Sequence, residues 1–384
     1  MKIARSAYGT LQSLFFAKQK ATLKRKIQNS TFVQKTKTHL KRKNLKIDIL
    51  QKIFAILKIE VFMEIKGFTY GYSAKKGMYN CEKGIESQNE LMKTGINWVC
   101  LAFPVNQKTY SSTEIYFDYR YNMPDLEIIE TINRFHDKNI KVCLKPMINC
   151  SDGVWRALID FPDATMMEED YYWKQWFDFY QAFLEHYAQI AEFTKCEMFC
   201  LGCEMLGTER KEDYWRQTIA KVRNIYSGPL VYNTNHGKEE VAQWYDAIDY
   251  IGTSAYYPVE KMPGASKEEM VKEWKKIAAN LKVLSKKLGK KIIFMEIGCR
   301  SALGCAQMPW DFVHKEFPVN EEEQANFYES SLSVMANEDW FMGYFWWDWS
   351  TWIYNSKEEA QKDKGFNIHL KKAEDVIKKW YTEK

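Results

Sequence analysis

Residues 291–297, KIIFMEI, decide the fold class of this 384-residue chain. Their apolar side chains occupy both alternating positions of an extended segment, which is typical of a strand covered by helices on one face and by a packed interior on the other. From Met63 onward, eight runs of this kind alternate with segments of helical spacing. The runs lie at 64–72, 98–105, 141–148, 197–204, 230–233, 250–256, 291–297 and 341–347. Eight strand–helix pairs predict a closed parallel (β/α)8 barrel, a TIM barrel.

An open, doubly wound α/β sheet is the competing architecture. Sheets of that kind that bind dinucleotides carry a GxGxxG turn after the first strand, and Gly67, Gly71 and Gly77 do not have this spacing. Residues 63–384 exceed the roughly 250 residues that a TIM barrel needs. They contain no internal repeat and no Pro-rich or Ser-rich linker. We therefore expect one barrel domain over 63–384, with a helix after each run, including one at about 238–247.

The net charge of +5 is unevenly distributed along the chain. Residues 1–62 hold 15 Lys and Arg but only 2 Asp and Glu, whereas the remaining residues hold 40 basic and 48 acidic side chains. We expect 1–62 to be a basic extension that is unstructured or weakly helical and that could touch an anionic surface. The acidic remainder would repel phosphate, so we expect no nucleic-acid partner for the barrel. The sequence does not predict the oligomeric state.

The cysteines and the apolar segments bear on the cellular location. Nine cysteines, an odd number spread from Cys81 to Cys305, are not typical of a disulfide scaffold, and no stretch of 18 apolar residues occurs. We therefore expect reduced thiols and a cytoplasmic protein. Cys200 and Cys203 have the spacing of half a zinc site, but no second pair accompanies them and the six histidines do not cluster. We expect neither a metal nor another cofactor.

Two glutamates end apolar runs at the edge where a barrel enzyme carries its active site. Glu204 closes the fourth run, in FCLGCEM, and Glu296 lies near the end of the seventh, in IFMEIG. A carboxylate at the end of an apolar strand is costly to desolvate unless it has a partner or a chemical task. The carboxyl ends of parallel barrel strands meet at one mouth. Two carboxylates facing each other there are typical of glycoside hydrolysis.

The chain resembles glycoside hydrolase family 113, a β-mannanase family of the retaining (β/α)8 glycosidase clan. The resemblance covers about residues 65–382 and rests on four segments. These are LGCE at 201–204, WRQTIAKVRNIYSGPL at 215–230, AIDYIGTSAY at 247–256 and FMEIG at 294–298. It implies that Glu204 is the acid/base, that Glu296 is the nucleophile, and that the substrate is a β-1,4-mannan or manno-oligosaccharide. Much of the clan has Asn before the acid/base, where this chain has Cys203, a weak hydrogen-bond donor.

Six further residues are candidates for contacting the substrate or the two glutamates. The resemblance implies that Tyr256 binds the nucleophile and that Trp347 forms the floor of the sugar site. Trp155 and Trp310 follow the third and seventh runs, where aromatic faces suit pyranose rings. Lys145 closes the segment VCLK at 142–145 within the third run, and Asn235 follows the fifth run. Either side chain can bind a hydroxyl group, and Lys145 can also pair with a carboxylate. Each of the six could instead be an ordinary core or surface residue.

The two glutamates predict a glycoside hydrolase of carbohydrate metabolism, and the resemblance implies that it retains the anomeric configuration by double displacement. Two alternatives stay open. A carbohydrate-binding pseudoenzyme would keep the aromatic mouth but not the turnover, and a hydrolase of another β-glycan would keep the chemistry but not the substrate. Neither the chain length of the substrate nor the choice between endo and exo action follows from the sequence.

Overall fold

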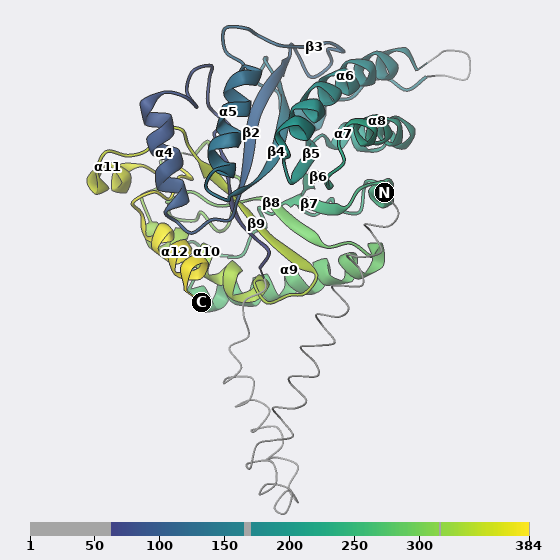
Figure 1. Ribbon diagram of the computed structural model, residues 1–384. Coiled ribbons are helices and arrows are strands. Elements are labelled where there is room, and N and C mark those ends of the chain that lie inside the picture. Colours follow the sequence, from purple (N-terminus) through teal and green to yellow (C-terminus); the bar gives the residue numbers. More distant parts are fainter. Residues whose placement is uncertain (1–62, 165–169, 315, 384) are drawn as a thin grey trace, which may run out of the picture. The chain divides into compact units, whose positions relative to one another are not determined.

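The computed structural model describes residues 63–164, 170–314 and 316–383, which contain a closed barrel of eight parallel strands with helices around it (Figure 1). The strands, in chain order, are β1 (Ile65–Tyr70), β2 (Trp98–Gln107), β4 (Lys141–Cys150), β5 (Met198–Cys203), β6 (Leu230–Asn235), β7 (Tyr250–Ser254), β8 (Ile292–Ile297) and β9 (Phe341–Trp349). Because β1 pairs in parallel with both β2 and β9, the eight parallel strands form a closed barrel. The predicted (β/α)8 barrel is confirmed, and the extension predicted at 1–62 lies outside the described residues.

The helices follow the strands in the predicted alternation, with one exception. They are α4 (Glu82–Met92), α5 (Asp125–His136), α6 (Tyr171–Thr194), α7 (Leu206–Glu209), α8 (Glu212–Ile225), α9 (Lys267–Leu288), α10 (Glu321–Met335), α11 (Lys357–Lys362) and α12 (Lys372–Thr382). The helix expected at 238–247 is replaced by turns and a short 3-10 helix, η2 (Tyr245–Ala247). In this segment the side chain of Glu239 is buried and accepts a hydrogen bond from Thr253 Oγ1 of β7 at 2.8 Å. This contact with β7 holds the segment in a conformation that is not helical.

The ends of α9 show how the sequence sets a helix boundary. Ser266 and Glu269 form a reciprocal capping box at the start of the helix. Lys286 and Lys287 lie in the last turn, where cations interact favourably with the helix dipole. Gly289 then ends the helix in a left-handed conformation with a φ of 65°, which glycine adopts without a steric penalty.

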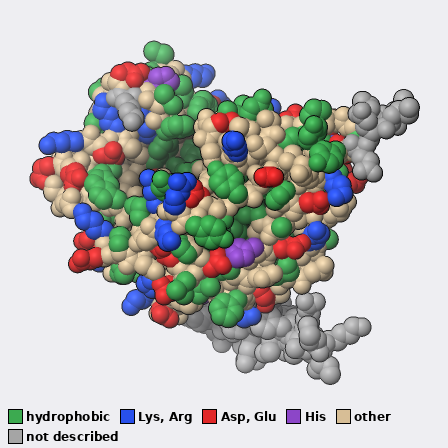
Figure 2. Space-filling model, turned by 90° about the horizontal axis from the view of Figure 1, so that it is seen from above, with side chains coloured by type: hydrophobic (Ala, Val, Ile, Leu, Met, Phe, Trp, Pro, Cys, Tyr) green, Lys and Arg blue, Asp and Glu red, His purple; other side chains and the backbone are tan. Residues whose placement is uncertain are grey.

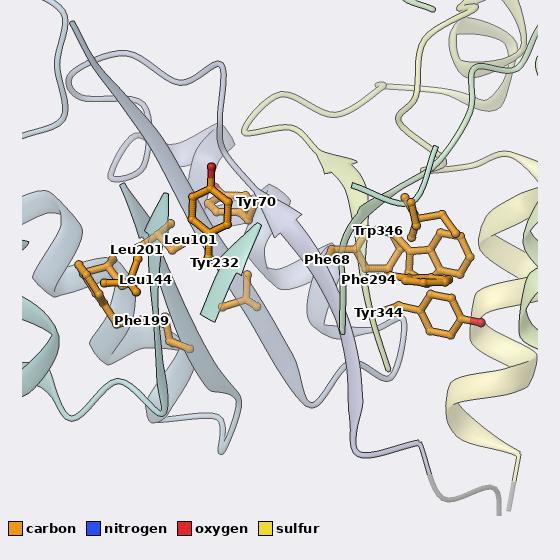
Figure 3. Close-up of a cluster of buried hydrophobic side chains, with 14 of the residues drawn as sticks. Phe68, Tyr70, Leu101, Leu144, Phe199, Leu201, Tyr232, Phe294, Tyr344 and Trp346 are labelled. Carbon is orange, nitrogen blue, oxygen red and sulfur yellow. The ribbon is translucent and has the colours of Figure 1, made fainter. Parts of the chain in front are cut away.

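Each strand packs on both of its faces. On β8, Ile293 and Met295 join a cluster made of strand residues alone, which fills the barrel interior. Ile292 and Phe294 join a second, larger cluster that contains the helix residues as well (Figure 3). This arrangement confirms the reading of KIIFMEI as a strand that is apolar on both faces.

Two further features border the mouth of the barrel. The short strand β3 (Ile115–Tyr116) pairs antiparallel with the end of β2, and the 3-10 helix η1 (Arg156–Leu158) follows β4. Among the helices of the described residues, none has both the length and the apolar composition that a membrane span requires.

Candidate active site

Two β-bulges aim the candidate catalytic residues into the barrel. Thr253 pairs with Phe294 and Ser254 with Glu296, so β8 has one more residue than β7 between these pairs. β5 likewise has an extra residue relative to β6 between Cys200 and Cys203. A bulge reverses the alternation of side chains along a strand. Glu296 is therefore turned to the interior, together with Met295.

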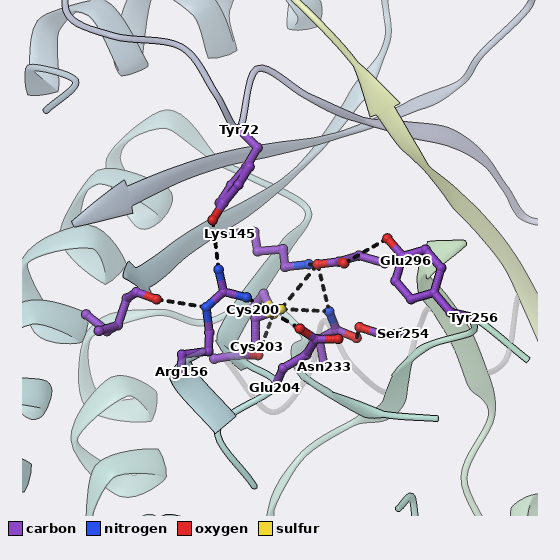
Figure 4. Close-up of polar contacts among 12 residues, drawn as sticks. Tyr72, Lys145, Arg156, Cys200, Cys203, Glu204, Asn233, Ser254, Tyr256 and Glu296 are labelled. Carbon is purple, nitrogen blue, oxygen red and sulfur yellow. Dashed lines mark hydrogen bonds and ion pairs between the residues drawn. The ribbon is translucent and has the colours of Figure 1, made fainter. Parts of the chain in front are cut away.

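Glu296 is enclosed by donors from four neighbouring segments (Figure 4). Its Oε1 lies 2.5 Å from Lys145 Nζ and accepts hydrogen bonds from Cys203 Sγ and Asn233 Nδ2, both at 3.2 Å. Tyr256 OH donates to Oε2 at 3.1 Å. Burial alone would raise the pKa of Glu296. The charge and hydrogen bond of Lys145, together with the charge of Arg156 and the hydrogen bond of Cys203, hold this pKa below its usual range. Glu296 is thus held as a carboxylate.

Glu204 directly follows β5 in an unusual backbone conformation. Its φ is 53°, in the left-handed region, and its N–H donates to the carbonyl of Asn233 at 2.7 Å. The side chain is 13% exposed, and its Oε2 accepts from Trp155 Nε1 at 3.3 Å and from Arg156 Nη1 at 3.4 Å. Burial, with the negative charge of Glu296 adding to it, raises the pKa of Glu204 above its usual range although Arg156 opposes the shift. The two carboxyl groups are therefore tuned in opposite directions.

Arg156 connects Glu204 to the loop after β1. Its Nε donates to the carbonyl of Ile148 at 2.8 Å, and its Nη2 donates to Tyr72 OH at 2.8 Å and to Asn149 Oδ1 at 2.6 Å. Burial would lower the pKa of Arg156, but the surrounding acidic groups, Tyr72 first among them, keep it raised. The guanidinium is thus a fixed cation beside Glu204.

The structure brings some of the predicted residues together and leaves others at the rim. Lys145 and Tyr256 contact Glu296, and Trp155 contacts Glu204 while its side chain stays half exposed. Trp347 lies against Tyr72, with ring centroids 5.0 Å apart. The roles predicted for these residues stay predictions.

Trp310 and Asn235 lie in the segments after β8 and at the end of β6. Trp310 stacks on His236, with centroids 5.5 Å apart, and is 44% exposed. Asn235 is buried, and its Oδ1 has no hydrogen-bond partner among the described residues. Within the described residues, neither Trp310 nor Asn235 forms a hydrogen bond with Glu204 or Glu296. Viewed from above, the molecule is hollowed and hydrophobic side chains border the hollow (Figure 2).

Three residues of this site were missed at the sequence level. Arg156 directly follows Trp155, and Asn233 lies two positions before Asn235, on the same face of β6. Their positions beside predicted site residues are the only signal that the sequence carries for them. Asp348 follows Trp347, and burial, with the charge of Glu296 adding to it, raises the pKa of Asp348 to about 7. For Asp348 the sequence offers only its place directly after the eighth run.

All nine cysteines are free thiols, and only Cys81 is exposed. Burial, with the charge of Glu296 adding to it, raises the pKa of Cys203, so this thiol is a protonated donor toward Glu296. Among the described residues, no group of three or more His, Cys, Asp or Glu is arranged to hold a metal ion. The cytoplasmic location stays a prediction.

A family model described as Glycoside Hydrolase Family 113 matches residues 68–371. The chain belongs to glycoside hydrolase family 113. The resemblance seen in the sequence is thereby confirmed, and the protein is a glycoside hydrolase. No curated protein matches the chain significantly.

This chain matches solved structures of family 113 over almost their whole length. A GH113 β-1,4-mannanase is 36% identical to it, with a TM-score of 0.76, over 84% of this chain and 99% of its own. The GH113 β-mannanase AaManA from Alicyclobacillus acidocaldarius, solved in complex with ManMIm, is 37% identical, with a TM-score of 0.75, over 83% and 97%. A β-glucuronidase from Faecalibacterium prausnitzii shares 12% identity and a TM-score of 0.54 over 84% of this chain and 49% of its own, which shows the fold alone.

Proposed function

We propose that this family 113 protein hydrolyses β-1,4-linked mannan or manno-oligosaccharides with net retention, with Glu296 as nucleophile and Glu204 as acid/base. The observation that carries the assignment is the contrast between a buried carboxyl group, Glu296, and a largely buried one, Glu204, at one barrel mouth. Lys145 keeps Glu296 ionised, whereas burial and the charge of Glu296 favour the protonated form of Glu204. A nucleophile and a general acid need these opposite protonation states.

In the first step, Glu296 attacks the anomeric carbon and Glu204 protonates the departing glycosidic oxygen. Tyr256 and Asn233 orient the attacking carboxylate through their hydrogen bonds. The negative charge of Glu296 is lost when the glycosyl-enzyme ester forms. The pKa of Glu204 then falls, because the like charge that raised it is gone.

In the second step, Glu204 acts as a base and takes a proton from the attacking water. Arg156, 3.4 Å from Glu204 Oε2, stabilises the carboxylate that this step requires. Hydrolysis of the ester returns the charge to Glu296, and Glu204 is protonated again. The product keeps the β configuration at the anomeric carbon.

The choice of mannan rests on the two family 113 structures named as mannanases. Cys203 replaces the Asn that many related enzymes place before the acid/base, but Asn233 brings an amide to within 3.1 Å of its sulfur. We infer that Trp155, Trp347, Trp310 and Asn235 bind sugar residues around the two glutamates. Aromatic faces there would stack on pyranose rings.

The test compares defined β-1,4-linked manno-, gluco- and xylo-oligosaccharides as substrates for the purified full chain. NMR follows the first anomer released, and Glu296→Ala serves as the matched inactive variant. We expect turnover of the manno series, with the β anomer formed first. An α anomer formed first would exclude retention. Binding of manno-oligosaccharides without any release would instead identify a pseudoenzyme, and preference for another series would change the substrate.

A further inference from the structure

Another buried glutamate, Glu209, lies behind the candidate acid/base. Glu209 ends α7 and is 1% exposed. Its Oε1 accepts from Tyr232 OH at 2.8 Å and from Thr234 Oγ1 at 3.2 Å, both on β6. Its Oε2 is buried and has no hydrogen-bond partner among the described residues. A buried carboxyl with an unpartnered oxygen costs stability, so its presence requires an explanation.

Tyr232 links Glu209 to the backbone at Glu204. Its hydroxyl accepts a hydrogen bond from the N–H of Met205 at 3.1 Å while it donates to Glu209. A tyrosine hydroxyl has one proton. Because Glu209 accepts that proton, an oxygen lone pair of Tyr232 is left to face Met205. By accepting the Tyr232 proton, Glu209 therefore makes the Tyr232 oxygen the acceptor for the N–H of Met205.

That hydrogen bond falls where the backbone is strained. Glu204 has a φ of 53°, and a residue with a Cβ rarely adopts this conformation unless its surroundings impose it. The N–H of Glu204 is held by Asn233 on one side, and the N–H of Met205 is held by Tyr232 on the other. Two adjacent peptide groups are thus fixed by β6.

We propose that Glu209 is a positioning residue for Glu204: by orienting the Tyr232 hydroxyl, it holds the left-handed turn that aims the Glu204 carboxyl at the glycosidic oxygen. The inference rests on the proposed function, since it takes Glu204 to be the acid/base. Glu209 lies on the helix side of β6 with Tyr232, a residue of the strand–helix core, and acts without touching substrate.

The leaving group of the substrate separates positioning from general damage. A manno-oligosaccharide needs a proton on its leaving oxygen, whereas a 2,4-dinitrophenyl β-mannoside leaves without one. Misplacing a catalytic group by about 1 Å costs on the order of 100-fold in rate. We expect Glu209→Ala to lower kcat on mannotetraose by about that factor with little change in KM. Its kcat/KM on the dinitrophenyl substrate, which reports glycosylation alone, should stay close to that of the unsubstituted protein.

Conservative and control variants complete the test. Glu209→Gln keeps an oxygen acceptor for Tyr232 and should rescue the oligosaccharide activity, whereas Tyr232→Phe should reproduce the selective loss. Glu374→Ala removes a carboxyl of α12 that is also buried, at 3% exposure, and that accepts a hydrogen bond from Leu370 N at 2.7 Å. This control should lower the melting temperature and leave the ratio of the two activities unchanged.

An equal loss on both substrates in Glu209→Ala, or in Tyr232→Phe if the first variant does not fold, overturns the positioning role. Crystal structures of these variants give a readout that does not depend on activity. A rotated peptide between Glu204 and Met205 supports the inference, and an unchanged one overturns it. If the unsubstituted protein hydrolyses no glycoside, the proposed function fails while these structures still decide the positioning role.

Discussion

Replacing Lys145 by Met tests how the protein keeps a buried carboxylate ionised. Met is nearly as long as Lys but carries no charge. The Lys145 side chain is fully buried, 2.5 Å from Glu296 Oε1, and it holds the pKa of Glu296 low against the effect of burial. Without this cation, burial prevails and the pKa of Glu296 should rise above its usual range.

The expected size of this change follows from burial and from the remaining donors. Fully buried carboxyl groups shift upward by up to about 3–5 pKa units. Because Asn233, Cys203 and Tyr256 still donate hydrogen bonds, we expect a rise of about 2 units, which corresponds to about 2.7 kcal/mol. At a pH two units below the new pKa, about 1% of Glu296 would be ionised in the variant and about half in the unsubstituted protein, so kcat/KM there should fall about 50-fold.

The dependence of stability on pH should change its sign as well. In the unsubstituted protein the pKa of Glu296 is lowered, so its ionisation adds stability above the unfolded pKa, and this stability is lost as the pH falls through the folded pKa. In Lys145→Met the folded pKa exceeds the unfolded value. The corresponding stability is then present at low pH and is lost as the pH rises through the folded pKa.

The assay measures kcat/KM on 2,4-dinitrophenyl β-mannoside against pH. This substrate needs no proton from Glu204, so its acidic limb reports Glu296 alone. Lys371→Met is the matched control, since Lys371 is 2% exposed and pairs with Asp363 at 2.9 Å. The control should lose stability without moving the limb. If folded Lys145→Met keeps its acidic limb, the cation does not set the charge of Glu296.

Four other outcomes are expected. Glu204→Gln should remove the alkaline limb of kcat/KM on mannotetraose, because the raised pKa of Glu204 sets that limb; a persisting limb would contradict this. With azide, NMR should show a β-glycosyl azide from Glu204→Ala and an α-glycosyl azide from Glu296→Ala, and one shared anomer would refute the two roles. Trp310→Ala should raise KM for long oligosaccharides but not for an aryl mannoside; equal effects would exclude a distant sugar platform. Deleting residues 1–62 should abolish sedimentation with anionic vesicles at low salt and leave kcat unchanged, and failure of the full chain to sediment would dismiss a surface role.

The barrel was predictable because its strands are buried on both faces and its helices return the chain in a regular alternation. The position of the two glutamates was predictable for a related reason. Parallel strands place their carboxyl ends at one mouth, so Glu204 and Glu296 had to lie at the same end of the barrel. The helix expected at 238–247 is wrong because local spacing cannot show that Glu239 is needed as a buried acceptor for β7.

Contacts made by loop residues and neighbouring strands were not predictable. Arg156 reaches Glu204 only because the turn into η1 brings its guanidinium back over β4, where Ile148 and Asn149 hold it. Asn233 and Asn235 share one face of β6, and spacing alone favours neither of them. Asn233 is the one that contacts Glu296. The pairing of β8 with its neighbouring strands sets where the Glu296 carboxyl lies along the barrel, and hence which of the two it meets.

The alternation along β8 would place Glu296 on the wrong face. Ile292 and Phe294 pack toward the helices, and in an uninterrupted strand Glu296 would follow them there. The extra residue opposite β7 reverses the pattern, and neither Met295 nor Glu296 is the glycine that often marks a bulge. An unpaired carboxylate among the helix-facing apolar side chains would be strongly destabilising, whereas the interior offers Lys145 and three neutral donors. The energetic cost of burying the charge, and not the periodicity of the strand, therefore correctly predicts which way Glu296 points.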